Sequence, residues 1–222
     1  MVVPARKSPA PAVSEENTRD RILSAAGEVF AEQGFDGATI RAITERAGVN
    51  VAAVNYHFRD KAELYARVVV GACAARAAWR EAMAAAADSP EERLRSLICH
   101  FVEYLLDPKR PDWRRRLMAR EMANPTAALD ELVEKNIRPL RDEFLMPTLR
   151  QLTAGRFSQR QLSYIGSSIM AQCHYYLQSR PIIERLNPGF KIGDSEIREI
   201  AEHIARFSLA ALAELTRQAR RS

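Results

Sequence analysis

The chain has 222 residues, of which 47% are hydrophobic and 27% are charged, so it can form a substantial core and has the charge content of a soluble protein. No apolar run approaches the roughly 18 residues that a membrane span requires, and residues 1–13 lack the apolar segment of a secretory signal. Three distant cysteines and four histidines without metal-ligand spacing predict a cytoplasmic protein with reduced thiols, no metal site and no cofactor.

The net charge of +5 does not by itself indicate a DNA-binding surface. Residues 15–65 hold six basic and nine acidic side chains, so the positive excess lies later in the chain. An argument for nucleic-acid binding must therefore depend on where individual charges lie. Scarce glycine and short β-branched runs favour an all-α fold.

The first helix is expected over about residues 18–33, because apolar residues recur there at the spacing of one buried face. Gly34 is expected to end this helix. A second, shorter helix is predicted over residues 40–47, with Thr39 as its N-cap.

A tight turn and a third helix come next. Gly48 permits a sharp turn, and Asn50 can cap a helix over residues 51–57. Two short helices joined by a tight turn with a glycine are the helix-turn-helix pattern. The N-terminal region therefore predicts a three-helix bundle.

A long, alanine-rich fourth helix is expected to begin near Lys61, because Asp60 and Glu63 resemble a capping box. Further helices are predicted over residues 91–106, 112–122, 126–152, 158–179 and 195–217.

Proline and aspartate set the expected irregularities in this second half. Pro139 and Pro147 each lack a backbone donor, so kinks or a break are expected there. Residues 181–193 are expected to be irregular, with one helical turn. Asp194 is expected to cap the last helix, and its apolar residues Ile197, Ile200, Ile204, Phe207, Ala211 and Leu215 are expected on one stripe.

One stretch of about 26 residues resembles the signature of the TetR family of transcriptional regulators. The matching residues are Thr39, Ile43, Ala47, Gly48, Val49, Tyr56, His57, Phe58, Lys61 and Leu64. The first helix, which ends in Phe30, Gly34 and Phe35, extends the match to about residues 18–65. The resemblance implies three parts, namely a disordered N-terminal arm (1–14), a helix-turn-helix DNA-binding domain (15–65) and a helical effector-binding and dimerisation domain (66–222).

The resemblance also implies which residues contact double-stranded operator DNA. They are Thr39, Arg41, Asn50, Val51, Ala52, Ala53, Asn55, Tyr56, His57 and Lys61. Small and amide side chains suit the major groove, where asparagine can pair with adenine and alanine can touch a thymine methyl group. Asn50 and Asn55 stand where the family often has serine or threonine and leucine. Asn55 is therefore either a base reader or a polar surface residue.

Three later segments resemble the C-terminal domain of the CecR-like (YbiH-like) subgroup. They are residues 113–126, 136–139 and 172–186. The resemblance implies a pocket for a small-molecule effector of unknown identity, and pockets of this kind are mostly apolar with a few polar groups. The candidates, each of which could instead be ordinary helical core, are Trp79, Met83, Phe101, Tyr104, Leu105, Met118, Glu121, Met122, Phe144, Met170, Cys173, His174 and Tyr175.

Together these features predict a ligand-responsive regulator. The expected protein is a homodimeric repressor that binds a palindromic operator and is released by its effector, with the last two helices forming the dimer interface. Activation in place of repression stays open, as does a DNA-binding organiser without any ligand. A helical enzyme is disfavoured, because no cysteine–histidine pair, carboxylate dyad, phosphate loop or metal cluster is evident in the sequence.

Overall fold

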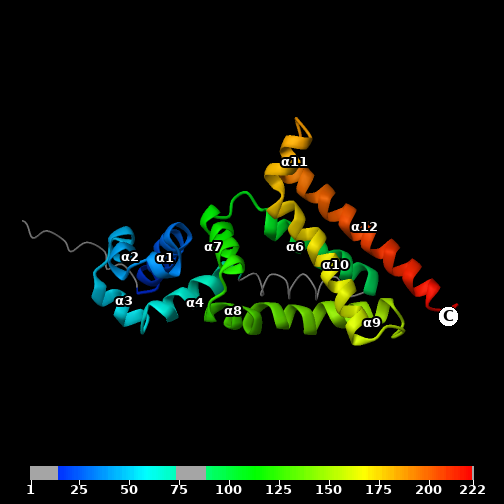
Figure 1. Cartoon of the computed structure of the whole chain (residues 1–222), viewed down its shortest axis with the longest axis horizontal. Coiled ribbons are helices and arrows are strands. Elements are labelled where there is room, and N and C mark those ends of the chain that lie inside the picture. The colour runs from blue at the N-terminus through cyan, green and yellow to red at the C-terminus, as the bar shows by residue number, and fades with distance from the viewer. Residues whose placement is uncertain (1–14, 74–88, 222) are drawn as a thin grey trace, which may run out of the picture. The chain divides into compact units, whose positions relative to one another are not determined.

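The structure is a computed structural model that describes residues 15–73 and 89–221 (Figure 1). Within these ranges every regular element is a helix, which confirms the all-α prediction. The predicted N-terminal arm and the later part of the predicted fourth helix, which includes Trp79 and Met83, lie outside the described residues. No helix in the described ranges is long and apolar enough to cross a membrane.

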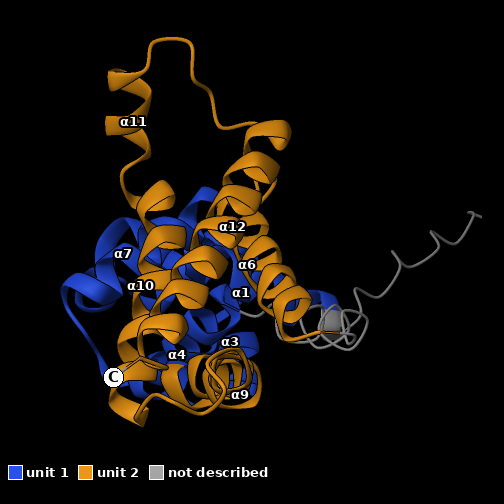
Figure 2. Ribbon diagram, turned by 90° about the vertical axis from the view of Figure 1, so that its right-hand side faces the viewer, with its two compact units in different colours: residues 1–73, 111–132 blue, residues 74–110, 133–222 orange. Residues whose placement is uncertain are grey.

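The chain divides into two compact units that do not follow chain order (Figure 2). Unit 1 takes residues 1–73 and 111–132, and unit 2 takes residues 74–110 and 133–222. The helices of unit 1 are α1 (Glu15–Gly37), α2 (Ile40–Ala47), α3 (Val51–His57), α4 (Lys61–Ala72), α7 (Asp112–Ala123) and α8 (Ala127–Leu132). The helical elements of unit 2 are α6 (Pro90–Leu106), the π-helices η1 (Val133–Ile137) and η2 (Leu140–Leu145), α9 (Met146–Leu152), α10 (Gln159–Gln178), α11 (Arg180–Leu186) and α12 (Asp194–Gln218).

Helix α1 lies at the centre of unit 1 and packs against α2, α4 and α7. Its predicted apolar face is confirmed as core, and the residues of that face are Ile22, Ala25, Ala26, Val29 and Phe30. The helical geometry breaks at Gly34, whose φ of 76° only glycine adopts readily. The first helix therefore ends its regular part where the sequence predicts, before a last turn to Gly37.

Helix α7 contacts α1 more closely than an ordinary helix pair. A Cβ atom on Gly27 would lie 2.6 Å from the indole ring of Trp113. The guanidinium group of Arg120 donates to the carbonyl oxygens of Ala31 and Glu32, both at 2.8 Å. Because these carbonyls lie in the last regular turn of α1, a cation there also complements the helix dipole.

Unit 2 is built on α6, which packs against α9, α10 and α12. Leu94, Ile98 and Val102 of α6 are buried together with Ile197, Ala201 and Ile204 of α12. In each of the two helices the buried residues recur every three or four positions, as predicted for one buried face.

The two prolines act differently from each other. Around Pro139 the chain stays helical and widens into the π turns of η1 and η2, so the expected irregularity is a change of helix type and not a break. Pro147 lies in the first turn of α9, where a missing N–H donor costs little.

Two predictions about the last helix are wrong. Gly193 and not Asp194 is the N-cap residue of α12, and no side chain caps this end. Phe207 and Leu215 are 58% and 40% exposed, so they do not share the buried stripe of Ile197, Ile200 and Ile204. Helix α12 thus has an inner apolar face and a second, outer one.

The close approach of α1 and α7 can be tested with Gly27→Ala. The added methyl group has no free space against Trp113, so the free energy of unfolding should fall by about 1–3 kcal/mol, the usual cost of overpacking. Gly71→Ala is the matched control, because no atom lies within 4 Å of its Cβ position in helix α4. Urea denaturation should show Gly71→Ala unchanged or slightly more stable. Equal stability of the two variants would contradict the contact.

Candidate nucleic-acid interface

Helices α2 and α3 and the turn between them are fixed by local capping groups. The Thr39 hydroxyl accepts from the Ala42 N–H at 3.1 Å, and the Asn50 side chain accepts from the Ala53 N–H at 2.8 Å. Gly48 has a φ of 64° and ends α2 in the left-handed conformation. The caps and the glycine turn of the predicted helix-turn-helix are therefore confirmed.

Helix α3 presents almost all of its surface to solvent. Val54 is its one buried residue, while Val51, Ala52, Asn55 and Tyr56 are exposed. Tyr56 is 72% exposed, although a tyrosine that served mainly for packing would be covered. The rings of Tyr56 and His57 meet edge to face at 5.0 Å, and His57 and Ala53 are half-buried at the sides of the helix. The exposed surface of α3 thus carries small groups, an amide and a phenol.

The other predicted DNA contacts surround α3. Arg41 forms an exposed ion pair with Glu45 at 2.9 Å, so its guanidinium group is already held along α2. At the start of α4, Asp60 accepts from the Glu63 backbone N–H, and this bond together with Arg59 lowers the pKa of the Asp60 carboxyl group. Asp60 is thereby confirmed as the N-cap of α4.

The ammonium group of Lys61 is bound to backbone carbonyl groups, whereas a phosphate contact would require it to be free. Its ammonium group donates to the carbonyl oxygens of Phe35 at 2.9 Å, of Ala38 at 3.0 Å and of Asp36 at 3.5 Å. It also lies 4.6 Å from the centroid of the Phe35 ring. A lysine has three N–H donors, and these three carbonyl oxygens at the end of α1 and in the link to α2 can accept all of them.

Arg21 was not singled out by the sequence. Its guanidinium group donates to the carbonyl oxygens of Ala47 at 2.7 Å and Gly48 at 3.1 Å, across 26 and 27 positions of sequence. No spacing rule could have found this contact, because it follows from the packing of α1 on the end of α2.

The effector candidates do not form one group. Phe101, Leu105, Phe144, Met170, Cys173 and His174 all belong to unit 2 and lie in or against its core. The rings of Phe101 and His174 meet at 5.3 Å. Burial raises the pKa of the Cys173 thiol to about 12, so it is a neutral, apolar part of this cluster. These six residues lie in or against one core, and their role as effector contacts stays a prediction.

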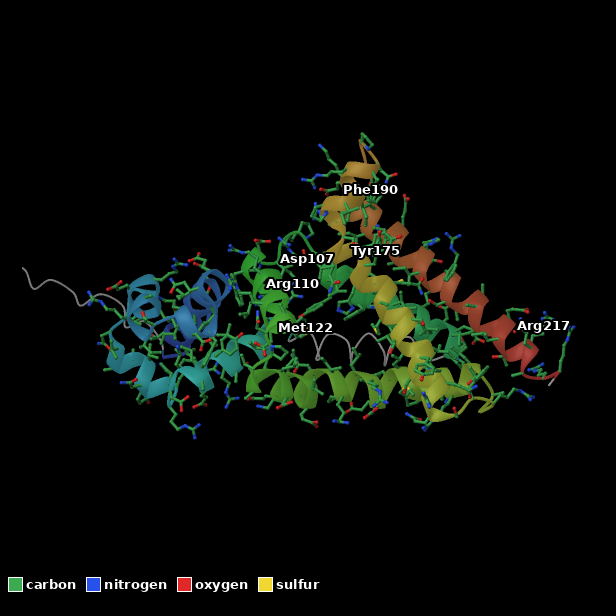
Figure 3. All side chains as sticks on the ribbon, viewed as in Figure 1. Asp107, Arg110, Met122, Tyr175, Phe190 and Arg217 are labelled. Carbon is green, nitrogen blue, oxygen red and sulfur yellow. The ribbon has the colours of Figure 1, made fainter. Side chains whose placement is uncertain are left out.

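Three candidates belong to unit 1. Glu121 is fully buried, and its carboxyl group accepts from the Tyr65 hydroxyl at 2.6 Å and from the backbone and hydroxyl of Thr126 at 2.8 and 3.0 Å. Met118 packs against the core of unit 1, and Met122 lies exposed on α7 (Figure 3). The arrangement gives Glu121 a structural task in joining α4 to α7 and α8.

The last two candidates are Tyr104 and Tyr175, which also belong to unit 2. Arg110 lies 3.6 Å from the centroid of the Tyr104 ring and donates to the Tyr104 hydroxyl at 2.9 Å. Tyr175 projects from α10 (Figure 3) and lines a shallow groove between α10 and α12. The groove is lined by Ala171, Gln172, Tyr175, Tyr176, His203 and Ile204.

Metal-ligating side chains do not gather in the part of the chain that the structure describes, where no three histidine, cysteine, aspartate or glutamate residues could share an ion. The capped turn and the exposed face of α3 define a helix-turn-helix protein. The sequence agrees with this class over two stretches. The family profile "Bacterial regulatory proteins, tetR family" matches residues 22–68, and the profile of the C-terminal domain of the HTH-type transcriptional dual regulator CecR matches residues 90–212.

The second match covers more than half of the chain, and this protein belongs to the TetR family of transcriptional regulators, with a C-terminal domain of the CecR type. The matched families are regulators and not enzymes, as the sequence predicts.

Similar proteins of known name are repressors and regulators. The chain is 35% identical over 97 residues to the HTH-type transcriptional repressor AcnR of Corynebacterium efficiens, which covers 44% of this chain and 45% of AcnR. It is 46% identical over 65 residues to the HTH-type transcriptional regulator SrpR of Pseudomonas putida, which covers 29% of each chain. The chain thus spans less than half the length of either relative.

Solved structures share the fold. A transcriptional regulator from Pseudomonas aeruginosa PAO1 superposes with a TM-score of 0.69 at 20% identity, over 92% of this chain and 96% of that one. FadR from Bacillus subtilis, solved in complex with stearoyl-CoA, superposes with a TM-score of 0.65 at 12% identity, over 86% and 97% of the two chains. At these identities the likeness concerns the fold alone.

The contacts of Lys61 can be tested with Lys61→Met, which keeps the apolar stem and removes the ammonium group. Three carbonyl oxygens then lose a charged donor, so the free energy of unfolding should fall by about 1–2 kcal/mol. Arg67→Met is the control, because it removes only an exposed ion pair with Glu63, worth about 0.3–0.5 kcal/mol. Urea denaturation compares the two variants. A Lys61→Met protein as stable as the control would show that the ammonium group does not bind these carbonyls.

Proposed function

We propose that this protein is a cytoplasmic transcriptional regulator that inserts α3 into the major groove of operator DNA. The observation that carries the proposal is the exposed surface of α3, which has one buried residue and otherwise offers small and hydrogen-bonding groups to solvent. The major groove is about 12 Å wide and admits an α-helix with small side chains. A helix with so little buried surface gains little for the fold of a single chain, which supports a role in contacting a partner.

The proposed contacts divide into two kinds. Asn55 and Ala52 are exposed on α3 and would read base edges, with Val51 and Ala53 beside them. Tyr56, His57, Arg41 and the capped helix starts at Thr39 and Asn50 would meet phosphates, which fix position without reading sequence. Lys61 would reach a phosphate only by leaving some of its three carbonyl oxygens.

The proposal is tested by selecting duplexes from a random DNA library with the wild-type protein and measuring affinity for the selected sequence by gel shift. Enrichment of one sequence motif is the expected result. Binding that is equal for selected and unselected duplexes, or absent, would overturn the proposed function.

Two substitutions should separate the two kinds of contact. Tyr56→Ala should weaken binding to selected and unselected duplexes alike and leave the slope of log K against log salt unchanged, because an uncharged phenol releases no counterion. Asn55→Ala should leave the slope unchanged and relax the base preference at one position, by about 1–3 kcal/mol of discrimination. Arg67→Ala on α4 is the control. Identical effects of the two variants would contradict the assignment.

The proposed regulator acts as a homodimer through the outer faces of α10 and α12. Large apolar side chains on these faces are between 40% and 58% exposed, and they are Tyr164 and Tyr175 on α10 and Phe207 and Leu215 on α12. A second copy related by a two-fold axis would cover both faces with the same residues. Such a dimer favours a palindromic operator, because the symmetries of protein and DNA then agree.

The proposed interface is tested with Phe207→Glu, which places a charge on the outer face of α12. We expect a monomer in sedimentation velocity at a concentration where the wild type is a dimer, because a buried charge without a partner is costly. Leu186→Glu is the matched control, since Leu186 is 73% exposed on α11 and lies outside the proposed interface. A dimer of unchanged affinity in Phe207→Glu would refute this interface.

The proposed effector is a small molecule held by unit 2. The cluster of Phe101, Leu105, Phe144, Met170, Cys173 and His174 supports a largely apolar site with one polar ring. A solved protein of this fold, FadR, binds stearoyl-CoA, which supports the idea that such helices can enclose a ligand without indicating its identity here. The effector would relieve repression by binding one conformation of the dimer better than the other. The relative AcnR is a repressor, which favours this sense over activation.

A further inference from the structure

We propose that Arg21 is a positioning residue that fixes the orientation of α3 for operator binding without contacting DNA. The inference rests on the proposed function and adds to it a residue outside the helix-turn-helix motif. Its basis is the contact that Arg21, on α1, makes with the two carbonyl oxygens at the end of α2.

Helix α3 has few restraints of its own. It has seven residues, of which Val54 is buried and Ala53 packs half-buried against the core, so packing along its length fixes it over two adjacent positions. Its orientation must therefore be set at its ends. After α3, the buried side chain of Phe58 fixes the C-terminal end. Before α3, the chain passes through Gly48, which has no side chain to pack, and through the half-buried Val49, which packs against the core of unit 1.

Arg21 supplies a polar restraint at the N-terminal end, in addition to the packing of Val49. Its Nη2 atom lies 2.7 Å from the Ala47 oxygen and 3.1 Å from the Gly48 oxygen. These oxygens belong to the last residue of α2 and to the turn, where carbonyl groups have no partner within the helix. A guanidinium group cannot lose its charge, and it complements the negative end of the α2 dipole.

The fit at this contact is close. A Cβ atom on Gly48 would lie 3.1 Å from Nη2 of Arg21, so the turn and the guanidinium group leave little space between them. Gly48 itself is held by hydrogen bonds from its N–H to the carbonyl oxygens of Thr44 and Glu45. The turn is thus bound to α2 by its backbone and to α1 by Arg21, and α3 begins three residues after Gly48.

The test compares Arg21→Ala and Arg21→Lys with the wild type in full-length protein, on a duplex selected by the wild type and on an unselected duplex. At a temperature where all variants are folded, we expect Arg21→Ala to bind the selected duplex about tenfold to a hundredfold more weakly, the effect of one misplaced base contact. Its salt slope and its affinity for the unselected duplex should stay at wild-type values. Arg21→Lys should recover most of the loss, because an ammonium group can reach the same carbonyl oxygens.

Other outcomes overturn the inference. A lower melting temperature with unchanged affinity for the selected duplex would give Arg21 a role in stability alone. A salt slope reduced by about 0.9, with both duplexes weakened, would make it a phosphate contact. If the wild type shows no preference for any duplex, the proposed function fails first, so the two failures are distinguishable. Arg67→Ala is the control for the loss of one positive charge on unit 1.

Discussion

The structure of unit 1 depends on cationic side chains that bind carbonyl oxygens at the C-terminal ends of α1 and α2. Arg120 of α7 and Lys61 of α4 donate to carbonyl oxygens near the end of α1, and Arg21 of α1 donates to the last residue of α2. Each cation meets carbonyl groups that a helix or turn leaves without a partner. In the negatively charged N-terminal region, Lys61 and Arg21 therefore bind carbonyl groups within the fold. For this reason the net charge of the region is a poor guide to its DNA-binding surface.

Helix α7 follows α6 in sequence, yet it packs on α1, and its Glu121 meets Tyr65 of α4 in the core of the same unit. Burial and the hydrogen bond to Glu121 raise the pKa of the Tyr65 hydroxyl, so it stays a donor across the physiological range. The unit with the helix-turn-helix thus includes residues 111–132 in addition to the family motif. The domain boundary that the resemblance implies at residue 65 marks the end of the motif, whereas the compact unit extends beyond it.

Local features could be predicted from the sequence, while features that join distant segments could not. Thr39, Gly48 and Asn50 act through neighbours three or four residues away, so their caps and turn were predictable. The contact of Trp113 with Gly27 and the contact of Arg21 with Ala47 depend on tertiary packing, which periodicity does not encode. Phe207 was misplaced for a related reason, because one helix carries two apolar faces and the sequence does not say which is covered within the single chain.

The π turns of η1 and η2 set the rotational phase of α9, which continues directly from η2. A π turn holds one residue more than the α-helical turn it replaces, and one residue corresponds to about 100° of rotation in an α-helix. Shortening this region by one residue would therefore turn the side chains of α9 away from the core, although its composition would hardly change. Length variation between related chains is thus less tolerable in these turns than in the loop at residues 187–193.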